Sequence, residues 1–343
     1  MQEMKHQLTI LVLGEVTKEL RGQLFQPHMV KSAPHYFGTS VPHQIVLGEE
    51  KLLINDREIT FYIKGYQPDI LLVQTNSEVS NVFSQEIFEL ENKILDQSYK
   101  ILKSHGGIEE FSEIYSVFEV SGYKGEPEQF LEHAAIIAAL LKSEEKIALD
   151  KKEIEHTLSA QIKYANHDLA IIDWDGAFLF DHEGDFESTI ELLTLANVQL
   201  LRHRTLDRQL DERLEKMAKL VKKPEKKFFF FKEKELIQGL KEIIKDRMAS
   251  ISQFHALERE IKLIGDWYSA RLYDLTAKKF KIDEWRESIK DKMDSIEDVY
   301  SIVVENFSVS SKERAEWIQI IGFFILQIGW FVLIVLEFFY FTR

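Results

Sequence analysis

Residues 317–341 read WIQIIGFFILQIGWFVLIVLEFFYF, a run whose single charged side chain is Glu337. As an α-helix, this run would be roughly 37 Å long, enough to cross the ~30 Å hydrocarbon core of a bilayer with some tilt. A core helix of a soluble protein rarely stays apolar on every face for this length. The run therefore predicts one transmembrane helix, with Trp317 and Tyr340 as interfacial aromatic residues.

The flanks of this run predict how the protein lies in the membrane. Only two residues follow it, and the N-terminal MQEMKHQLTILVLGEV has a short apolar run that soon meets Glu15 and Lys18, as in a strand and unlike a signal peptide. We therefore expect a tail-anchored, single-pass protein of the inner or cell membrane, in contact with membrane lipid. The bulk of the chain would lie in the cytoplasm, or on the matrix side of an organelle, in accord with Lys312 and Arg314 before the span and Arg343 after it.

One face of the predicted span is suited to helix pairing. Its residues recur at steps of three and four: Gln319, Gly322, Leu326, Gly329, Leu333 and Leu336. Small residues on such a face let two backbones approach closely, and an amide can hydrogen-bond across the pair. We therefore expect a homo-oligomer, held weakly because the two glycines are seven residues apart and do not form the stronger G-x-x-x-G pattern.

A heptad-like seam leads into the span. Its apolar residues are Ile282, Trp285, Ile289, Met293, Ile296, Tyr300, Val303 and Phe307. Helical patterns also cover about 187–221 and 232–280, so residues 186–311 are expected to form a helical stalk, followed by the anchor at 312–343. The seam predicts an antiparallel coiled-coil hairpin that turns near Lys281, and an ordinary helical bundle would make almost the same contacts.

The chain before the stalk mixes strand and helix patterns. Strands are expected at 7–16, within KLLINDREITFYIK (51–64) on both sides of an Asn55-Asp56 turn, at 70–73, 114–120, 155–164 and 168–181, and helices at 84–103 and from Pro127 to about 140. This mixture predicts an α+β or α/β domain over residues 1–185.

A basic and aromatic stretch interrupts the stalk. Its members are Lys222, Lys223, Lys226, Lys227, Phe228, Phe229, Phe230 and Phe231. Basic residues beside an aromatic cluster are typical of segments at an anionic membrane interface. The alternative is a loop whose phenylalanines cap the bundle.

The composition excludes several classes of chemistry. A chain of 343 residues without cysteine has no disulfide, no cysteine-based zinc or iron–sulfur site and no thiol nucleophile. The 43 Lys and Arg against 57 Asp and Glu give a formal charge of −14, which argues against direct nucleic-acid binding. No phosphate-binding loop or metalloprotease motif is present, so we expect no cofactor.

The segment AIIDWDGAFLFD (170–181) resembles the first motif of haloacid-dehalogenase-type phosphatases. The resemblance implies Asp173 as nucleophile and Asp175 as acid–base group. That chemistry also needs a Lys and further carboxylates on later strands, whereas the chain downstream has only helical patterns. A β-hairpin turned at Asp175-Gly176 explains the same residues, so we expect no catalytic site here.

Two groups of residues could hold a metal. Asp181, Glu183 and Asp185 offer oxygen ligands of the kind that Mg²⁺ favours, although acidic residues are also common where a helix begins. Three Pro-His pairs, Pro27-His28, Pro34-His35 and Pro42-His43, could supply imidazole ligands or could simply form Pro-rich loops. We expect structural roles for both groups.

The C-terminal half resembles the mitochondrial and fungal Rmd/Sif family of RMND-type proteins. The resemblance is carried by LIGDWYSARLYDL (263–275), RESIKDKMDSIEDVYSIVVENF (286–307) and RAEWIQII (314–321). It implies attachment of a larger assembly to a membrane. The order of elements is also similar to that of CorA-type magnesium channels, but those have two spans and a Gly-Met-Asn signature, which this chain lacks.

Together these patterns predict a non-enzymatic scaffold or tether that presents a cytoplasmic domain to a protein partner. A second hypothesis is an accessory subunit of a transport complex that senses a metal or small ligand, and a third is a hydrolase at the DWDG segment.

Overall fold

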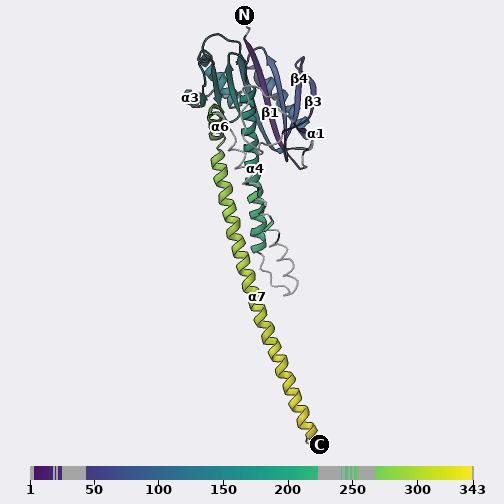
Figure 1. Ribbon diagram of the computed structural model, residues 1–343. Helices are drawn as coiled ribbons and strands as arrows, with labels where there is room; N and C mark the ends of the chain where they lie inside the picture. Colours follow the sequence, from purple (N-terminus) through teal and green to yellow (C-terminus); the bar gives the residue numbers. More distant parts are fainter. Residues whose placement is uncertain are drawn as a thin grey trace. The chain divides into compact units, whose positions relative to one another are not determined.

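The computed structural model describes residues 4–17, 20, 22–24, 44–222 and 267–341, with isolated positions between 241 and 254 (Figure 1). Of residues 219–222, 302–314 and 339 only the backbone is described. The chain forms two compact units. The first, called the sheet domain below, comprises Met1–Arg208 and Gln253–Ile289, and the second comprises Gln209–Ser252 and Lys290–Arg343.

The described part of the sheet domain is built on a nine-stranded sheet with the order β2-β3-β4-β5-β1-β6-β9-β8-β7. The strands are β1 (Lys5–Val16), β2 (Gln23–Leu24), β3 (Gln44–Ile54), β4 (Arg57–Tyr66), β5 (Ile70–Val79), β6 (Gly107–Ser121), β7 (Gln161–Ile162), β8 (Asp168–Ile172) and β9 (Gly176–Asp181). Neighbouring strands are antiparallel except β6 and β9, which are parallel.

Strand β1 lies in the middle of the sheet because its side chains are apolar on both faces. Leu8, Ile10 and Val12 belong to one hydrophobic core, and Leu11 and Leu13 belong to the other. Successive side chains of a strand point to opposite faces, so an uninterrupted apolar run requires cover on both sides.

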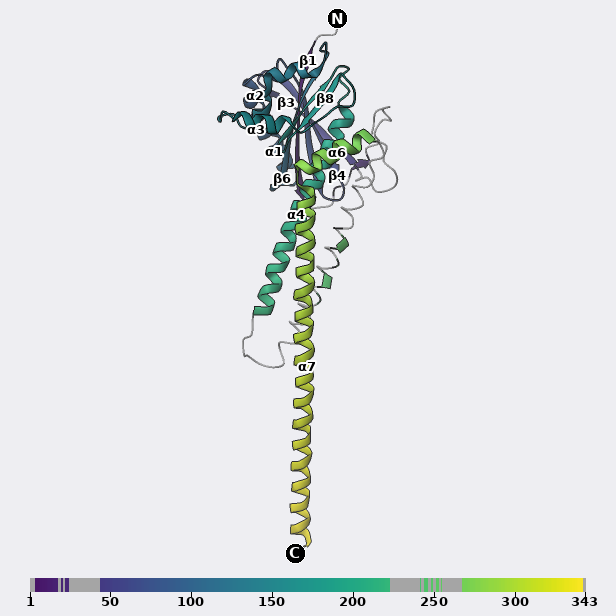
Figure 2. The same cartoon turned by 90° about the vertical axis from the view of Figure 1, so that its left-hand side faces the viewer.

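Helices cover both faces of the sheet, which gives three layers in the order helix, sheet, helix (Figure 2). On one face lie α1 (Glu86–Ser104), the 3₁₀ helix η1 (Pro127–His133) and α2 (Ala134–Leu141), with α3 (Lys151–Leu158) packed against α2. The other face is covered by the first half of α4 (Glu187–Lys222) and by α6 (Trp267–Lys279).

Most of the expected elements of the sheet domain are confirmed. The Asn55-Asp56 turn joins β3 to β4, and both residues adopt the positive φ angles, 50° and 60°, of a tight hairpin turn. The strand expected at 155–164 is wrong, because α3 continues through its first four residues. Asp150 starts this helix by accepting a hydrogen bond from the Lys152 backbone N–H at 2.9 Å, and only Gln161–Ile162 are extended.

The turn expected near Lys281 is also confirmed. Helix α6 ends at Lys279, α7 (Ile282–Phe341) begins at Ile282, and Lys281 between them has a φ of 50°. Phe280 in this turn is fully buried in the sheet domain and packs edge-on against Tyr115, with ring centroids 5.6 Å apart. The compact sheet domain therefore extends past the expected boundary at residue 185 and includes α6 and the start of α7.

In the second unit, α7 continues without a break to Phe341, and Lys292 donates to the carboxylate of Asp211 on α4 at 2.7 Å. Its stretch Ala315–Phe338 is 24 residues long, has none of its side chains buried and is long and apolar enough to cross a membrane. The three Pro-His pairs lie outside the described residues. So do residues 223–231 of the expected interfacial stretch, whose first member, Lys222, is the last residue of α4.

Candidate functional site

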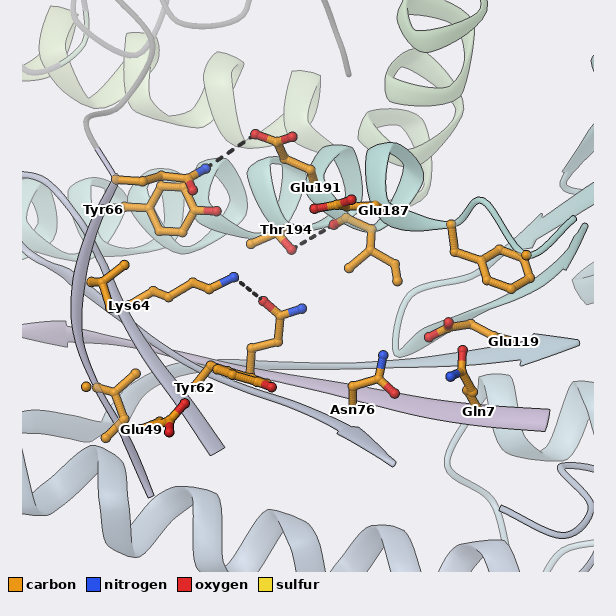
Figure 3. Close-up of a pocket in the computed structure, with 18 residues that line it drawn as sticks. Gln7, Glu49, Tyr62, Lys64, Tyr66, Asn76, Glu119, Glu187, Glu191 and Thr194 are labelled. Atoms are coloured by element: carbon orange, nitrogen blue, oxygen red, sulfur yellow. Dashed lines mark hydrogen bonds between the residues drawn. The ribbon is translucent and has the colours of Figure 1, made fainter. Parts of the chain in front are cut away.

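A polar cavity of about 940 Å³ lies between the sheet and the first turns of α4, entirely within the sheet domain (Figure 3). The sheet side contributes polar side chains from five strands, namely Gln7, Gln44, Glu49, Tyr62, Lys64, Gln74, Asn76 and Glu119. Helix α4 contributes Glu187, Glu191 and Thr194, with Phe186 and Ile190 as apolar neighbours. We call this space the α4 cavity.

The α4 cavity arises from the alternation of side chains along the strands. Leu8 and Val73 face the core under α1, whereas their neighbours Gln7 and Gln74 face α4. Further along the same face, Leu72 packs in the core under α4. This face of the sheet is thus apolar at one end and polar at the other, and the polar end forms the cavity floor.

Among the described residues that line this cavity, Lys64 alone carries a positively charged side chain. Its ammonium group donates to the amide oxygen of Gln74 at 2.9 Å. Burial lowers the pKa of Lys64, while the nearby carboxylates of Glu191 and Glu187 act in the opposite direction. Lys64 therefore lies within electrostatic range of the two glutamates on α4.

Burial raises the pKa of two acidic groups in the cavity. For Glu191 the ammonium of Lys64 and a 3.5 Å hydrogen bond from the Gln44 amide act against this rise. For Glu119, which is 2% exposed, burial raises the pKa to about 7, and the hydroxyl of Thr9, donating at 2.6 Å, lowers it in part. Glu119 is therefore a carboxyl group that titrates near neutral pH.

The α4 cavity is suited to binding. Its volume lies within the range of small-molecule sites, roughly 300–1,000 Å³, and its lining combines carboxylates, amides, hydroxyls and aromatic rings. The hydroxyl of Thr194 is engaged with the backbone oxygen of Ile190 at 2.7 Å. Among the described lining residues there is no pair of nucleophile and base of the kind that acyl or phosphoryl transfer uses.

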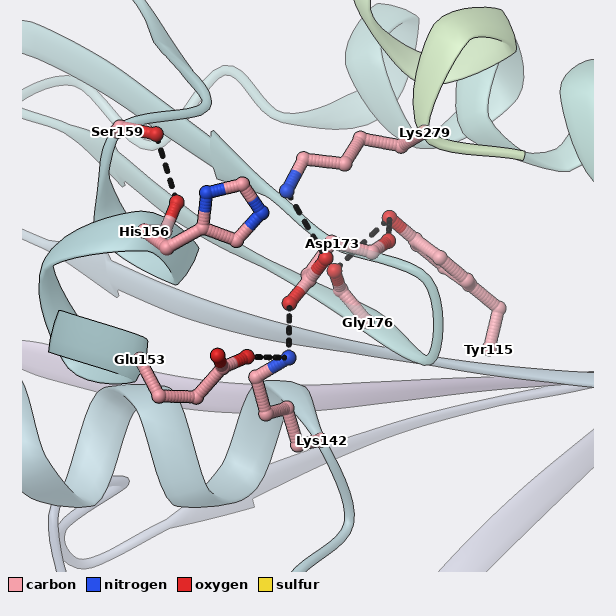
Figure 4. A network of polar contacts seen from close by, with 8 residues as sticks. All are labelled: Tyr115, Lys142, Glu153, His156, Ser159, Asp173, Gly176 and Lys279. Atoms are coloured by element: carbon pink, nitrogen blue, oxygen red, sulfur yellow. Dashed lines mark hydrogen bonds and ion pairs between the residues drawn. The ribbon is translucent and has the colours of Figure 1, made fainter. Parts of the chain in front are cut away.

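The residues of the DWDG segment form a second polar network (Figure 4). Asp173 is 6% exposed and makes ion pairs with Lys279 at 3.1 Å and Lys142 at 3.4 Å. Lys142 also pairs with Glu153 at 2.8 Å. Burial lowers the pKa of Lys142, but the Glu153 and Asp173 carboxylates outweigh burial, so that the pKa is raised overall.

The backbone of this segment forms the antiparallel hairpin that the sequence predicted, with β8 paired to β9. The hydroxyl of Tyr115 donates to the backbone oxygens of Asp173 at 3.2 Å and Gly176 at 2.9 Å, which fixes the turn. Burial, followed by the nearby Asp173 carboxylate, raises the pKa of Asp175. Through these ion pairs Asp173 links the turn to the C-terminal ends of α2 and α6.

A third group lies on the opposite face of the sheet. Glu91 of α1 is 5% exposed and accepts a short hydrogen bond from the hydroxyl of Ser116. Burial raises its pKa to about 7, and it lines a pocket of about 320 Å³ together with Asp175 and Glu145. This pocket is a third of the size of the α4 cavity and presents three acids with no basic group among its described residues.

The candidate metal ligands at the end of β9 are not arranged around a common point. One carboxylate oxygen of Asp181 accepts hydrogen bonds from the backbone N–H groups of Glu183, Gly184 and Asp185, at 2.8, 2.7 and 3.2 Å. Asp181 thus closes the loop that precedes α4. Across the part of the chain that the structure describes, no group of three or more histidine or acidic side chains could hold a metal ion.

The residues of the α4 cavity were not predicted from the sequence. The available signal was polar residues at alternate positions inside predicted strands, such as Tyr62 and Lys64 in FYIK, whose neighbours are apolar. That pattern is equally typical of a strand with one solvated face. Only the position of α4 shows that this face is covered.

Comparison with known proteins identifies a family and a relative. The family model described as "Uncharacterized protein MJ0711, N-terminal domain" matches residues 11–187. Uncharacterized protein MJ0711 of Methanocaldococcus jannaschii is 29% identical over 260 residues, which are 76% of this chain and 77% of the relative. No solved structure matches the chain. The resemblance of the C-terminal half to the Rmd/Sif family stays a prediction.

Proposed function

The chain belongs to the family of the MJ0711 N-terminal domain, and from that premise we propose that it is a non-enzymatic, membrane-anchored protein. In this proposal α7 holds the protein in the bilayer, and the sheet domain acts as a scaffold or tether for a protein partner. The observation that supports the anchor is the stretch Ala315–Phe338, whose large apolar side chains are exposed along its whole length. Soluble monomers rarely expose a contiguous apolar surface of this size.

We further propose that the sheet domain lies on the cytoplasmic side of a cell membrane, or on the matrix side in an organelle. The support is the pair of basic residues, Lys312 and Arg314, that precedes the apolar stretch. Positively charged flanks favour the cytoplasmic side. The coiled-coil arrangement of the stalk belongs to the same proposal.

The proposal is tested by placing charges in the middle of the apolar stretch. Replacing Leu326 and Leu333 with Arg should make the protein extractable from membranes by alkaline carbonate, because each Arg at the bilayer centre costs roughly 2.5–3.5 kcal/mol. The matched control replaces the same two leucines with Met and should stay in the membrane pellet. Retention of the Arg variant, or loss of the Met variant, would overturn the anchor.

A second candidate function is favoured by the α4 cavity. The sheet domain would then sense a small ligand as an accessory subunit of a membrane complex. A cavity of about 940 Å³ with a buried carboxyl group exceeds what packing alone requires. A ligand that raises the melting temperature of the full-length protein would favour this role over a plain tether.

A further inference from the structure

We propose that the α4 cavity binds a small organic cation that carries two or more primary amines, of the diamine or polyamine type. The proposal rests on the ligand-sensing role above and names the class of ligand. It follows from the charge of the cavity, from an acid on its floor that lacks a positive partner, and from the apolar surface between its charged ends.

The charges in the cavity favour a cation. Four carboxyl groups line it, from Glu49, Glu119, Glu187 and Glu191, against the single ammonium of Lys64. Opposite charges attract more strongly in a partly buried site than in water, because the effective dielectric constant is lower. An anionic ligand would meet these carboxyl groups on both sides of the space.

The carboxyl groups lie on two sides of the cavity, which suits a ligand with separated charges. Glu119 lies on the sheet beside Gln7, whereas Glu187 and Glu191 project from α4 (Figure 3). Lys64 is close enough to the α4 pair for both carboxylates to act on its pKa. The α4 side therefore has one ammonium group for two carboxylates, and the Glu119 side has none among the described residues of the cavity.

Glu119 is the strongest single indication of a ligand. One of its oxygens accepts from Thr9, and among the described residues no cation pairs with it. A buried carboxyl group without a positive partner is costly when ionised, which is consistent with its raised pKa. An ammonium group in the cavity would supply both the missing charge and hydrogen-bond donors for the second oxygen.

The remaining lining suits the carbon chain of such a ligand. The side chains of Phe186 and Ile190 and the rings of Tyr62 and Tyr66 offer surface for methylene groups. Aromatic rings also attract ammonium groups. The amide oxygen of Asn76 on the floor can accept a further N–H. A bare metal ion would use none of this apolar surface.

The test measures binding to the full-length protein in detergent by calorimetry, in about 150 mM salt, where weak surface attraction is screened. The probes are 1,4-diaminobutane and spermidine, with 1,4-butanediol and succinate as neutral and anionic probes of similar length, and Mg²⁺. We expect saturable binding of one diamine or spermidine per chain, and no binding of the diol or succinate.

Two variants locate the site. Glu119→Gln and Glu191→Gln keep the shape of each side chain and should each weaken spermidine binding by at least about tenfold, since each removes a charge-assisted hydrogen bond. The matched control, Glu58→Gln, changes an exposed acid of β4 outside the cavity lining and should bind as the unmodified protein does. Far-ultraviolet circular dichroism checks that all three variants are folded.

Several results would overturn the proposal: no binding of any amine, tighter binding of succinate, equal competition by Mg²⁺, or unchanged spermidine affinity in folded Glu119→Gln and Glu191→Gln variants. Failure of amine binding in the α4 cavity is distinguishable from failure of the membrane anchor. Membrane retention depends on residues 315–338 and should be unchanged in every cavity variant. Binding of a different, non-cationic ligand at the same residues would keep the sensing role and reject the amine class.

Discussion

Three glutamates of the sheet domain, Glu91, Glu113 and Glu119, are each less than a tenth exposed. Burial raises the pKa of Glu91 and Glu119 to about 7 and that of Glu113 to about 6, although the Arg204 guanidinium lowers the last in part. Each of these carboxyl groups accepts a hydrogen bond from a neighbouring side chain, Glu91 from Ser116, Glu113 from Arg204 and Glu119 from Thr9. Their protons link the stability of the fold to pH.

The folded protein should therefore lose stability as pH rises from about 4.5 to about 7. In this window the native state keeps protons on Glu119 and Glu91 that the unfolded chain releases, so the free energy of unfolding falls and then levels off. Glu119→Gln should flatten part of this slope and raise stability above pH 7 by up to about 3 kcal/mol. Urea unfolding of the full-length protein and the variant at several pH values measures these free energies of unfolding. A steeper slope in the variant would contradict the burial argument.

Asp173 offers a second test at this scale. Asp173→Asn removes the charge that holds Lys142 and Lys279, and should lower the free energy of unfolding by about 1–3 kcal/mol. Adding Lys279→Met should restore part of the loss, because an unpaired, partly buried ammonium group is then removed. The control, Asp283→Asn, breaks an exposed pair with Arg286 and should change stability by less than about 0.5 kcal/mol. Loss of cellular function with unchanged stability and abundance would instead indicate a chemical role for Asp173.

Among the elements, the β8–β9 hairpin shows what the sequence could predict and what it could not. AIIDWDGAFLFD carries two apolar runs around a turn, and local turn chemistry was enough to predict the hairpin. Its parallel pairing with β6 depends on a distant strand and left no local signal. The error at 155–164 has a different cause, because a local signal, the N-cap Asp150, starts the helix that runs into this range.

The parallel β6–β9 pairing depends on a glycine. A Cβ at Gly176 would lie 2.6 Å from the backbone oxygen of Ser116 on β6, which cannot move aside as a flexible side chain could. Gly176→Ala should therefore lower the free energy of unfolding by about 1–3 kcal/mol or more. Gly48→Ala is the matched control, since a Cβ there meets no atom within 4 Å. Equal stability of the two variants in thermal denaturation would show that β9 tolerates a shift.

At the scale of the whole molecule, α7 links the two units because it begins in the core of the sheet domain and ends in the apolar stretch. The length and composition of that stretch were readable from sequence, as was the turn at Lys281. The packing of this turn in the sheet domain could not be read from the sequence, because it depends on long-range contacts of Phe280 and Lys279. The heptad seam is equally typical of a helix in a free stalk and of a helix packed on a domain, so it did not distinguish the two.

Self-association through the apolar stretch is a further expectation at this scale. A Cβ at Gly322 or Gly329 would meet no atom within 4 Å, so both positions are open to a second helix. Replacing both with Ile should reduce the dimer seen by in-membrane crosslinking several-fold, because such contacts are worth only about 1 kcal/mol each. Phe324→Ile with Phe331→Ile, on a different face, is the control. A crosslinked dimer unaffected by the glycine variants would leave the stretch as a plain anchor.

A single-span anchor places the two ends of the chain on opposite sides of the membrane. Because the chain has no cysteine, Glu58→Cys in the sheet domain and Arg343→Cys beyond the apolar stretch each introduce one reactive thiol. With a membrane-impermeant maleimide, we expect labelling of the Arg343→Cys variant in intact cells, and of the Glu58→Cys variant only in inside-out vesicles or after lysis. Labelling of both variants from the same side of a sealed membrane would contradict a single-span anchor.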